Sequence, residues 1–197
     1  MQNAAERFGF NQNFLFRDLV VSNSVYPRGE QTRESLAASG YGQSSVALTP
    51  LHLCLISAAI ANDGRMMEPR LVRKVNTSSG AAVLTWSSAG LGDVCDSSAV
   101  QALQSLMKDT VQGGGSGASA SVTTLDIRGK TGTSESTDHG GKINYGWFTG
   151  YNAQADLPVA VSVLVEDIPD GETGGTTAAL IVKELFTWLK NHPDRVQ

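Results

Sequence analysis

The feature that most constrains the fold is a run of three strand-like segments, at residues 124–133, 144–153 and 158–167. Each contains β-branched or aromatic residues and is bounded by glycine, proline or polar residues, which is typical of strands joined by turns. Pro158 opens the third segment, a position at which a strand tolerates proline. Because short loops connect the segments, we expect an antiparallel meander.

A helix is expected to close this meander. The glycine-rich turn at residues 170–175 leads into residues 176–192, whose apolar side chains recur at helical spacing. Five of these side chains are expected to pack on the sheet: Leu180, Ile181, Leu185, Trp188 and Leu189.

The first half of the chain is expected to be mainly helical. The clearest helix follows Thr49, which can cap it, has Pro50 at its first position and ends before Gly64. The other expected elements are short helices at 2–8 and 32–38, a β-hairpin at 69–86, an amphipathic helix at 97–112 and a flexible small-residue loop at 113–123. The predicted fold class is therefore α+β, with three C-terminal sheet strands and a β-hairpin packed with helices.

Composition excludes several classes of function. The chain of 197 residues suits one domain or a large piece of one. Its 15 basic and 19 acidic residues give a net charge of −4 without a basic run, so no nucleic-acid partner is expected. Cys54 and Cys95 lack the spacing of a metal site, and no cofactor is expected. No stretch reaches the roughly 20 apolar residues of a transmembrane helix.

The phrase "RGKTGTSES", residues 128–136, carries the chemistry. One interpretation is a phosphate-binding loop, which needs Gly-x-x-x-x-Gly-Lys-[Ser/Thr] followed by a helix. The position of its first glycine is Thr124, and Gly132 and the polar residues after it interrupt any helix. The phosphate interpretation therefore fails on both sequence and context.

The other interpretation is a Lys-Thr-Gly strand that holds a carboxylate. The ammonium of Lys130 and the hydroxyl of Thr131 can bind that carboxylate, and Gly132 leaves room for a peptide along the strand edge. The backbone N–H of Thr133 can then point at a developing oxyanion. Taken alone the triplet is weak evidence, since a solvated lysine at a strand end has the same sequence.

The surrounding blocks strengthen this interpretation. In order, they are "ERFGFN", "GYGQSSVALTPLHLCLISAAIANDGRMMEPRLV", "GSGASA", "RGKTGTSES", "GWFTGYNAQADLPVAVSVLVED" and the closing helix. Over nearly its whole length the chain resembles the transpeptidase domain of class B penicillin-binding proteins. The resemblance implies the penicillin-binding-protein/serine β-lactamase-like fold. In that family the D-Ala-D-Ala end of a peptidoglycan stem peptide, or a β-lactam, acylates an active-site serine.

Three motifs serve this chemistry in the family: Ser-x-x-Lys, Ser-x-Asn and Lys-Thr-Gly. The resemblance assigns substrate binding to Lys130, Thr131 and Gly132, and a catalytic role as oxyanion donor to Thr133. The first two motifs precede the "FGFN" block in the family, whereas this chain begins at that block. It contains no Ser-x-Asn, and its one Ser-x-x-Lys, at Ser105, falls in the middle of an expected helix.

We therefore expect residues 1–197 to be the C-terminal part of one transpeptidase domain, without the nucleophile and inactive alone. The parent protein would be membrane-anchored and act outside the cytoplasm, and its missing N-terminal part would be a partner of this chain. Without that part, the edge of segment 158–167 would invite self-association.

Two alternatives remain open: a non-catalytic penicillin-fold module that binds a peptide or protein partner, and a small hydrolase that uses Ser105. Among other polar and aromatic residues, Asp138 and His139 are expected in a solvated loop, and Trp147 and Phe148 in the core.

Overall fold

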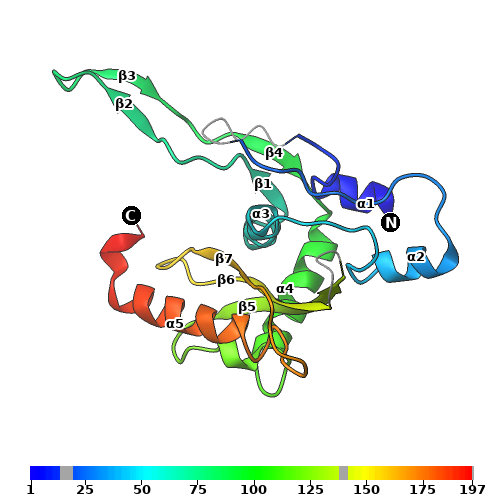
Figure 1. Ribbon diagram of the computed structural model, residues 1–197. Coiled ribbons are helices and arrows are strands. Elements are labelled where there is room, and N and C mark those ends of the chain that lie inside the picture. Colours follow the sequence, from blue (N-terminus) through cyan, green and yellow to red (C-terminus); the bar gives the residue numbers. More distant parts are fainter. Residues whose placement is uncertain (14–19, 138–141, 197) are drawn as a thin grey trace.

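The computed structural model describes residues 1–13, 20–137 and 142–196. Its centre is a three-stranded sheet of β5 (Ile127–Ser136), β6 (Ile143–Asn152) and β7 (Ala160–Val165), shown in Figure 1. The strands are antiparallel and lie in the order β5-β6-β7. The predicted meander is therefore confirmed.

The register of these strands separates their side chains into two faces. Phe148 lies opposite Thr131 and Val163, while Trp147 lies opposite Gly132 and Leu164. Because side chains alternate along a strand, Phe148 and its opposite residues share one face and Trp147 and its opposite residues share the other.

The face that contains Phe148 packs against α5 (Ala178–Asn191). Phe148, Phe186 and Val182 are completely buried in this cluster. Its other buried members are Val111, Ala120, Val122, Ile127, Leu157, Val161, Ala178, Ala179 and Leu189. This apolar cluster is the largest in the described structure and fixes the meander to α5.

The predicted packing face of α5 is wrong except for Leu189. Leu180, Ile181, Leu185 and Trp188 are between 36% and 49% exposed. Residues 181, 185 and 188 form an apolar stripe at the same helical spacing as 182, 186 and 189, so the periodicity alone fits both. The structure buries the second stripe, next to Ala178 and Ala179, whose small side chains let the start of the helix lie close to the sheet.

The opposite face of the sheet meets α3 (Pro50–Ala61). The Thr49 hydroxyl caps this helix by accepting a hydrogen bond from the backbone N–H of His52, as predicted. A buried hydrogen bond of 2.6 Å joins the hydroxyls of Ser57 and Thr149, so α3 is tied to β6. The next helix, α4 (Ser97–Val111), contacts β5 and contributes Met107 to a small cluster with Ile60 and Tyr151.

The remaining elements surround α3. Figure 1 shows the predicted hairpin projecting away from the body of the molecule. Two short strands at its base pair with each other and were not predicted. The segment expected as a flexible loop contains a 3-10 turn with Ala120 buried. These elements are α1 (Gln2–Arg7), α2 (Arg33–Ser39), the β1–β4 pair (Arg65–Met67 and Gly90–Asp93), the β2–β3 hairpin (Lys74–Asn76 and Ala82–Thr85), and the 3-10 turns η1 (Ala118–Ala120) and η2 (Pro193–Arg195). None of the described helices is long and apolar enough to cross a membrane.

Candidate active site

The Lys-Thr-Gly segment of β5 lines a pocket of about 290 Å³. Its opposite wall is the segment that leads into α3, and Trp147 and Thr149 of β6 form part of its floor. The lining residues are Tyr41, Gly42, Gln43, Val46, Leu48, Leu53, Lys130, Thr131, Gly132, Thr133, Ser134, Trp147 and Thr149. The structure thus brings all four predicted site residues to one pocket.

The hydrogen-bonding phase of β5 determines where its backbone groups point. Just before the strand, the N–H of Ala153 donates to the carbonyl of Asp126 at 2.9 Å. In an antiparallel pair such bonds recur at every second residue, so the even-numbered residues of β5 face β6. Thr131 and Thr133 therefore direct their backbone N–H and C=O groups away from β6, toward the open side of β5.

Lys130 carries a positive charge at this open side. Its ammonium donates to the carbonyl of Thr131 at 2.7 Å, and the side chain is exposed. Within the described ranges Lys130 takes part in no ion pair, whereas Lys142 meets two carboxylates and Arg128 meets Asp126. The charge of Lys130 is thus available to an anionic ligand.

The two threonine side chains are held on the α5 face. The hydroxyl of Thr131 shares a hydrogen bond of 2.8 Å with Ser116, and that of Thr133 accepts one from the N–H of Gly174 at 3.3 Å. Sequence reasoning did not assign Ser116, although the "GSGASA" block that contains it was part of the resemblance. Ser116 therefore fixes the orientation of the Thr131 hydroxyl.

Two glycines, Gly174 and Gly132, allow close packing against β5 and β6 next to the pocket. A Cβ on Gly174 would collide with the carbonyls of Trp147 and Gly132, and one on Gly132 would lie 3.2 Å from the Cβ of Trp147. Trp147 itself was predicted in the core, but it is partly exposed and donates from Nε1 to the hydroxyl of Ser134 at 3.3 Å. That prediction is wrong because Trp147 lies on the pocket face, whereas Phe148, on the opposite face, is buried as predicted.

Ser105, the nucleophile of the small-hydrolase alternative, does not line the pocket that contains Lys130. It lies on an exposed part of α4. Asp138 and His139 lie outside the described residues. Across the described ranges, no cluster of three or more His, Cys, Asp or Glu side chains could hold a metal ion.

Comparisons with known proteins show the family to which the chain belongs. The family described as the penicillin binding protein transpeptidase domain matches residues 1–187 of the chain. The peptidoglycan D,D-transpeptidase PbpA of Mycolicibacterium smegmatis is 34% identical over 154 residues, which cover 75% of this chain and 30% of that protein. MrdA of Acinetobacter baumannii, also a peptidoglycan D,D-transpeptidase, is 30% identical over 224 residues, with 99% and 32% covered. The chain thus spans about a third of the length of these relatives.

Solved structures give the same result for the fold. Penicillin-binding protein A of M. tuberculosis, as a ceftriaxone acyl-enzyme complex, superposes with a TM-score of 0.81 at 29% identity, covering 93% of this chain and 41% of that one. Its imipenem acyl-enzyme complex gives a TM-score of 0.77 at 28% identity over the same share of both chains. The expected α+β fold is therefore confirmed.

Proposed function

Because the chain belongs to the penicillin-binding protein transpeptidase family, we propose that residues 1–197 form the C-terminal part of one transpeptidase domain acting in peptidoglycan cross-linking. The observation that carries this proposal is the open side of β5. There the charge of Lys130, which forms no ion pair with any described residue, and the outward-facing N–H of Thr133 lie three residues apart. Such an edge suits an acyl peptide that ends in a carboxylate.

Each residue of the edge has one role. Lys130 and Thr131 bind the carboxylate of a D-Ala-D-Ala stem peptide or of a β-lactam through charge-assisted hydrogen bonds, each worth about 1.5–3 kcal/mol. Gly132 lets the ligand lie against the strand, because no side chain fills that space. The N–H of Thr133 donates to the carbonyl oxygen as it becomes an oxyanion, and one such donor contributes about 10²–10³-fold in rate.

The serine that is acylated lies outside these 197 residues. The only Ser-x-x-Lys here starts at Ser105, whose exposed position on α4 is apart from the Lys130 pocket. On its own the chain therefore binds but does not form an acyl-enzyme. We further propose that the protein acts outside the cytoplasmic membrane and is anchored to it.

The free edge of β7 is the surface through which the chain associates. Among the described strands, β7 pairs with β6 alone. Its other side offers unpaired backbone groups to a strand of the preceding part of the domain, or to a second copy of the chain. Light scattering over a concentration series is expected to show self-association, and a monomer at high concentration would contradict this proposal.

Intact mass spectrometry after incubation with benzylpenicillin tests the assignment of roles. The expected result is no covalent adduct on this chain, with or without Ser105→Ala, and labelling of the longer protein. An adduct that Ser105→Ala abolishes would establish the small-hydrolase alternative instead. A longer protein that fluorescent penicillin does not label would favour a non-catalytic module that binds peptides or partners.

A further inference from the structure

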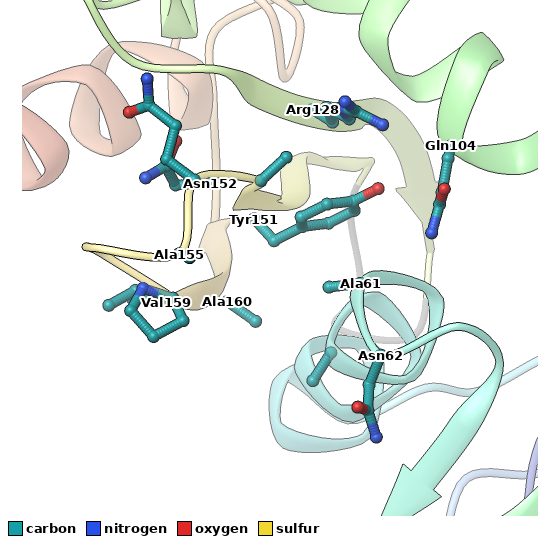
Figure 2. A pocket seen from close by; sticks show the side chains of 13 residues that line it. Ala61, Asn62, Gln104, Arg128, Tyr151, Asn152, Ala155, Val159 and Ala160 are labelled. Atoms are coloured by element: carbon teal, nitrogen blue, oxygen red, sulfur yellow. The ribbon is translucent and has the colours of Figure 1, made fainter. Parts of the chain in front are cut away.

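The charge of Lys130 distinguishes its pocket from a larger one, which lies where β5 begins and β6 ends. The larger pocket, of about 510 Å³, is also lined by residues of α3 and of the turn between β6 and β7 (Figure 2). Among the described residues that line it, Arg128 alone is charged, and it donates twice to one oxygen of Asp126, at 2.7 and 3.2 Å. Because that charge is already balanced, an anion is expected in the Lys130 pocket instead.

The two threonine hydroxyls that follow Lys130 differ in how their hydrogen bonds are directed. The Thr133 hydroxyl accepts from the backbone N–H of Gly174 at 3.3 Å, and an N–H can only donate. The Thr131 hydroxyl shares a hydrogen bond of 2.8 Å with the hydroxyl of Ser116, in which either oxygen can be the donor. The proton of Thr133 is therefore free for another bond, whereas that of Thr131 is free only when Ser116 donates.

A carboxylate bound at Thr131 would fix this direction. An ionised carboxylate only accepts hydrogen bonds, so Thr131 must donate its proton to it. Ser116 must then donate to the Thr131 oxygen, and the three groups form a chain in which each hydrogen bond strengthens the next. A neutral amide can instead donate an N–H to the Thr131 oxygen, and the Ser116 proton competes with that bond.

The backbone that carries Ser116 is held in place from two sides. The N–H of the next residue, Gly117, donates at 2.9 Å to the carbonyl of Thr110 in the last turn of α4. On the other side, a Cβ on Gly175 would collide with the carbonyl oxygen of Ser116. The Ser116 side chain is exposed, and its hydroxyl bonds to no described residue other than Thr131. The hydroxyl is thus well placed for Thr131 and has no second structural contact.

We propose that Ser116 is a positioning residue that makes the Thr131 hydroxyl a hydrogen-bond donor and so raises the selectivity of the Lys130 edge for a carboxylate over a neutral amide. Ser116 does not line the pocket, so it acts through Thr131. This inference rests on the function proposed above, in which Lys130 and Thr131 bind the carboxylate of the ligand.

NMR titration of the ¹⁵N-labelled chain tests this role, with N-acetyl-D-Ala-D-Ala and its C-terminal amide as ligands and the Thr133 amide as the reporter. Ser116→Ala should weaken binding of the carboxylate about twofold to fivefold, because the chain of hydrogen bonds loses its first donor. Binding of the amide should stay unchanged or become slightly tighter. Ser116→Thr, which keeps the hydroxyl, should restore the affinity for the carboxylate. The control Ser121→Ala removes an exposed hydroxyl near the start of β5 and should change neither affinity.

A double-variant cycle tests whether Ser116 acts through Thr131. Thr131→Val removes the hydroxyl and keeps the shape of the side chain. In that background Ser116→Ala should cause no further loss of affinity for the carboxylate, because the two changes interrupt the same chain of hydrogen bonds. A further loss of the same size in the double variant would show that Ser116 acts independently, and the inference would be wrong.

The remaining outcomes separate this inference from the proposed function. Failure of the unaltered chain to bind N-acetyl-D-Ala-D-Ala would overturn the proposed function and the role of Ser116 with it. Normal binding by the unaltered chain together with equal affinity in Ser116→Ala would overturn the role of Ser116 alone. The same conclusion would follow if Ser116→Ala weakened both ligands equally, or lowered the melting temperature by several degrees, since either result would indicate a structural role.

Discussion

The two faces of the β5–β6–β7 sheet come from the same three strands yet differ in composition and packing. The α5 face is closed, and its buried cluster consists of apolar residues only. The opposite face is more polar: Lys130, Thr149 and Tyr151 lie on it, and the pocket lined by Lys130 opens along it. Because side chains alternate along a strand, neighbouring residues of β5 and β6 face opposite sides of the sheet: one packs toward α5 and the next faces α3 and the pocket. A substitution in the buried apolar cluster should therefore change stability, whereas one at the exposed Lys130 should change binding.

The largest effect is expected at Phe186, which is fully buried against the sheet. Phe186→Ala should lower the free energy of unfolding by about 3–5 kcal/mol, because it removes an aromatic ring and leaves a cavity. Trp188→Ala, two residues along the same helix, should cost less than half as much, since Trp188 is 47% exposed. Urea unfolding measures both values, and a loss in Trp188→Ala as large as that in Phe186→Ala would contradict the packing of α5 described here.

A smaller loss is expected at Gly129, which faces α5 from the middle of β5. A Cβ there would lie 2.7 Å from the carbonyl oxygen of Thr149 and would also overlap the ring of Phe148. Gly129→Ala should therefore destabilise the fold by about 1–3 kcal/mol through overpacking. The matched control is the neighbouring Lys130→Ala on the other face, which should leave the urea midpoint nearly unchanged. A tolerated Gly129→Ala would mean that the two faces do not differ in this way.

Thr149 tests the contact between the polar face and α3. Its hydroxyl meets Ser57 at 2.6 Å in a buried site. Thr149→Val keeps the shape but leaves the Ser57 hydroxyl without this bond, so we expect a loss of about 1–3 kcal/mol. The double variant with Ser57→Ala should lose less than the sum of the two single changes. Simple additivity in calorimetry would indicate that the two hydroxyls do not depend on each other.

The free energy of unfolding should fall at acidic pH because of His52, which is buried in α3. Burial lowers the pKa of His52, although its hydrogen bond to the Phe8 carbonyl partly opposes the shift. The unfolded chain therefore binds this proton more readily than the folded one, and stability falls as the pH drops below about 6.5. The slope is at most about 1.4 kcal/mol per pH unit. Unfolding at pH 7 and pH 5.5 should show this loss, and His52→Gln should reduce it; an identical loss in the variant would place the effect elsewhere.

Much of this organisation follows from local sequence signals. Thr49 and Asp96 cap α3 and α4, glycine and proline separate the strands, and Lys-Thr-Gly locates the edge of the site. These signals act over a few residues, so a single sequence reveals them. The meander was predictable for the same reason, because its neighbouring strands are consecutive in the chain.

The features that were missed depend on tertiary contacts. The two stripes of α5 are equally apolar, and only the packed sheet selects the one that contains Phe186. The strands β1 and β4 are only three and four residues long, too short to show the alternation of apolar and polar residues that is typical of a strand. They also lie more than 20 residues apart, so no local turn signal reveals that they pair. Tyr151 looks like any other strand tyrosine in the sequence, and it is buried only because Ile60 of α3 and Met107 of α4 pack against it.

The central claim is that the Lys130 edge binds a carboxylate beside the N–H of Thr133. The most direct test is an NMR titration of the ¹⁵N-labelled chain with N-acetyl-D-Ala-D-Ala and with its C-terminal amide. We predict saturable shifts of the Thr133 amide with the free carboxylate, binding at least about tenfold weaker with the C-terminal amide, and a similar loss in Lys130→Ala at unchanged stability. Equal binding of both ligands at Thr133, or full binding by folded Lys130→Ala, would contradict the account.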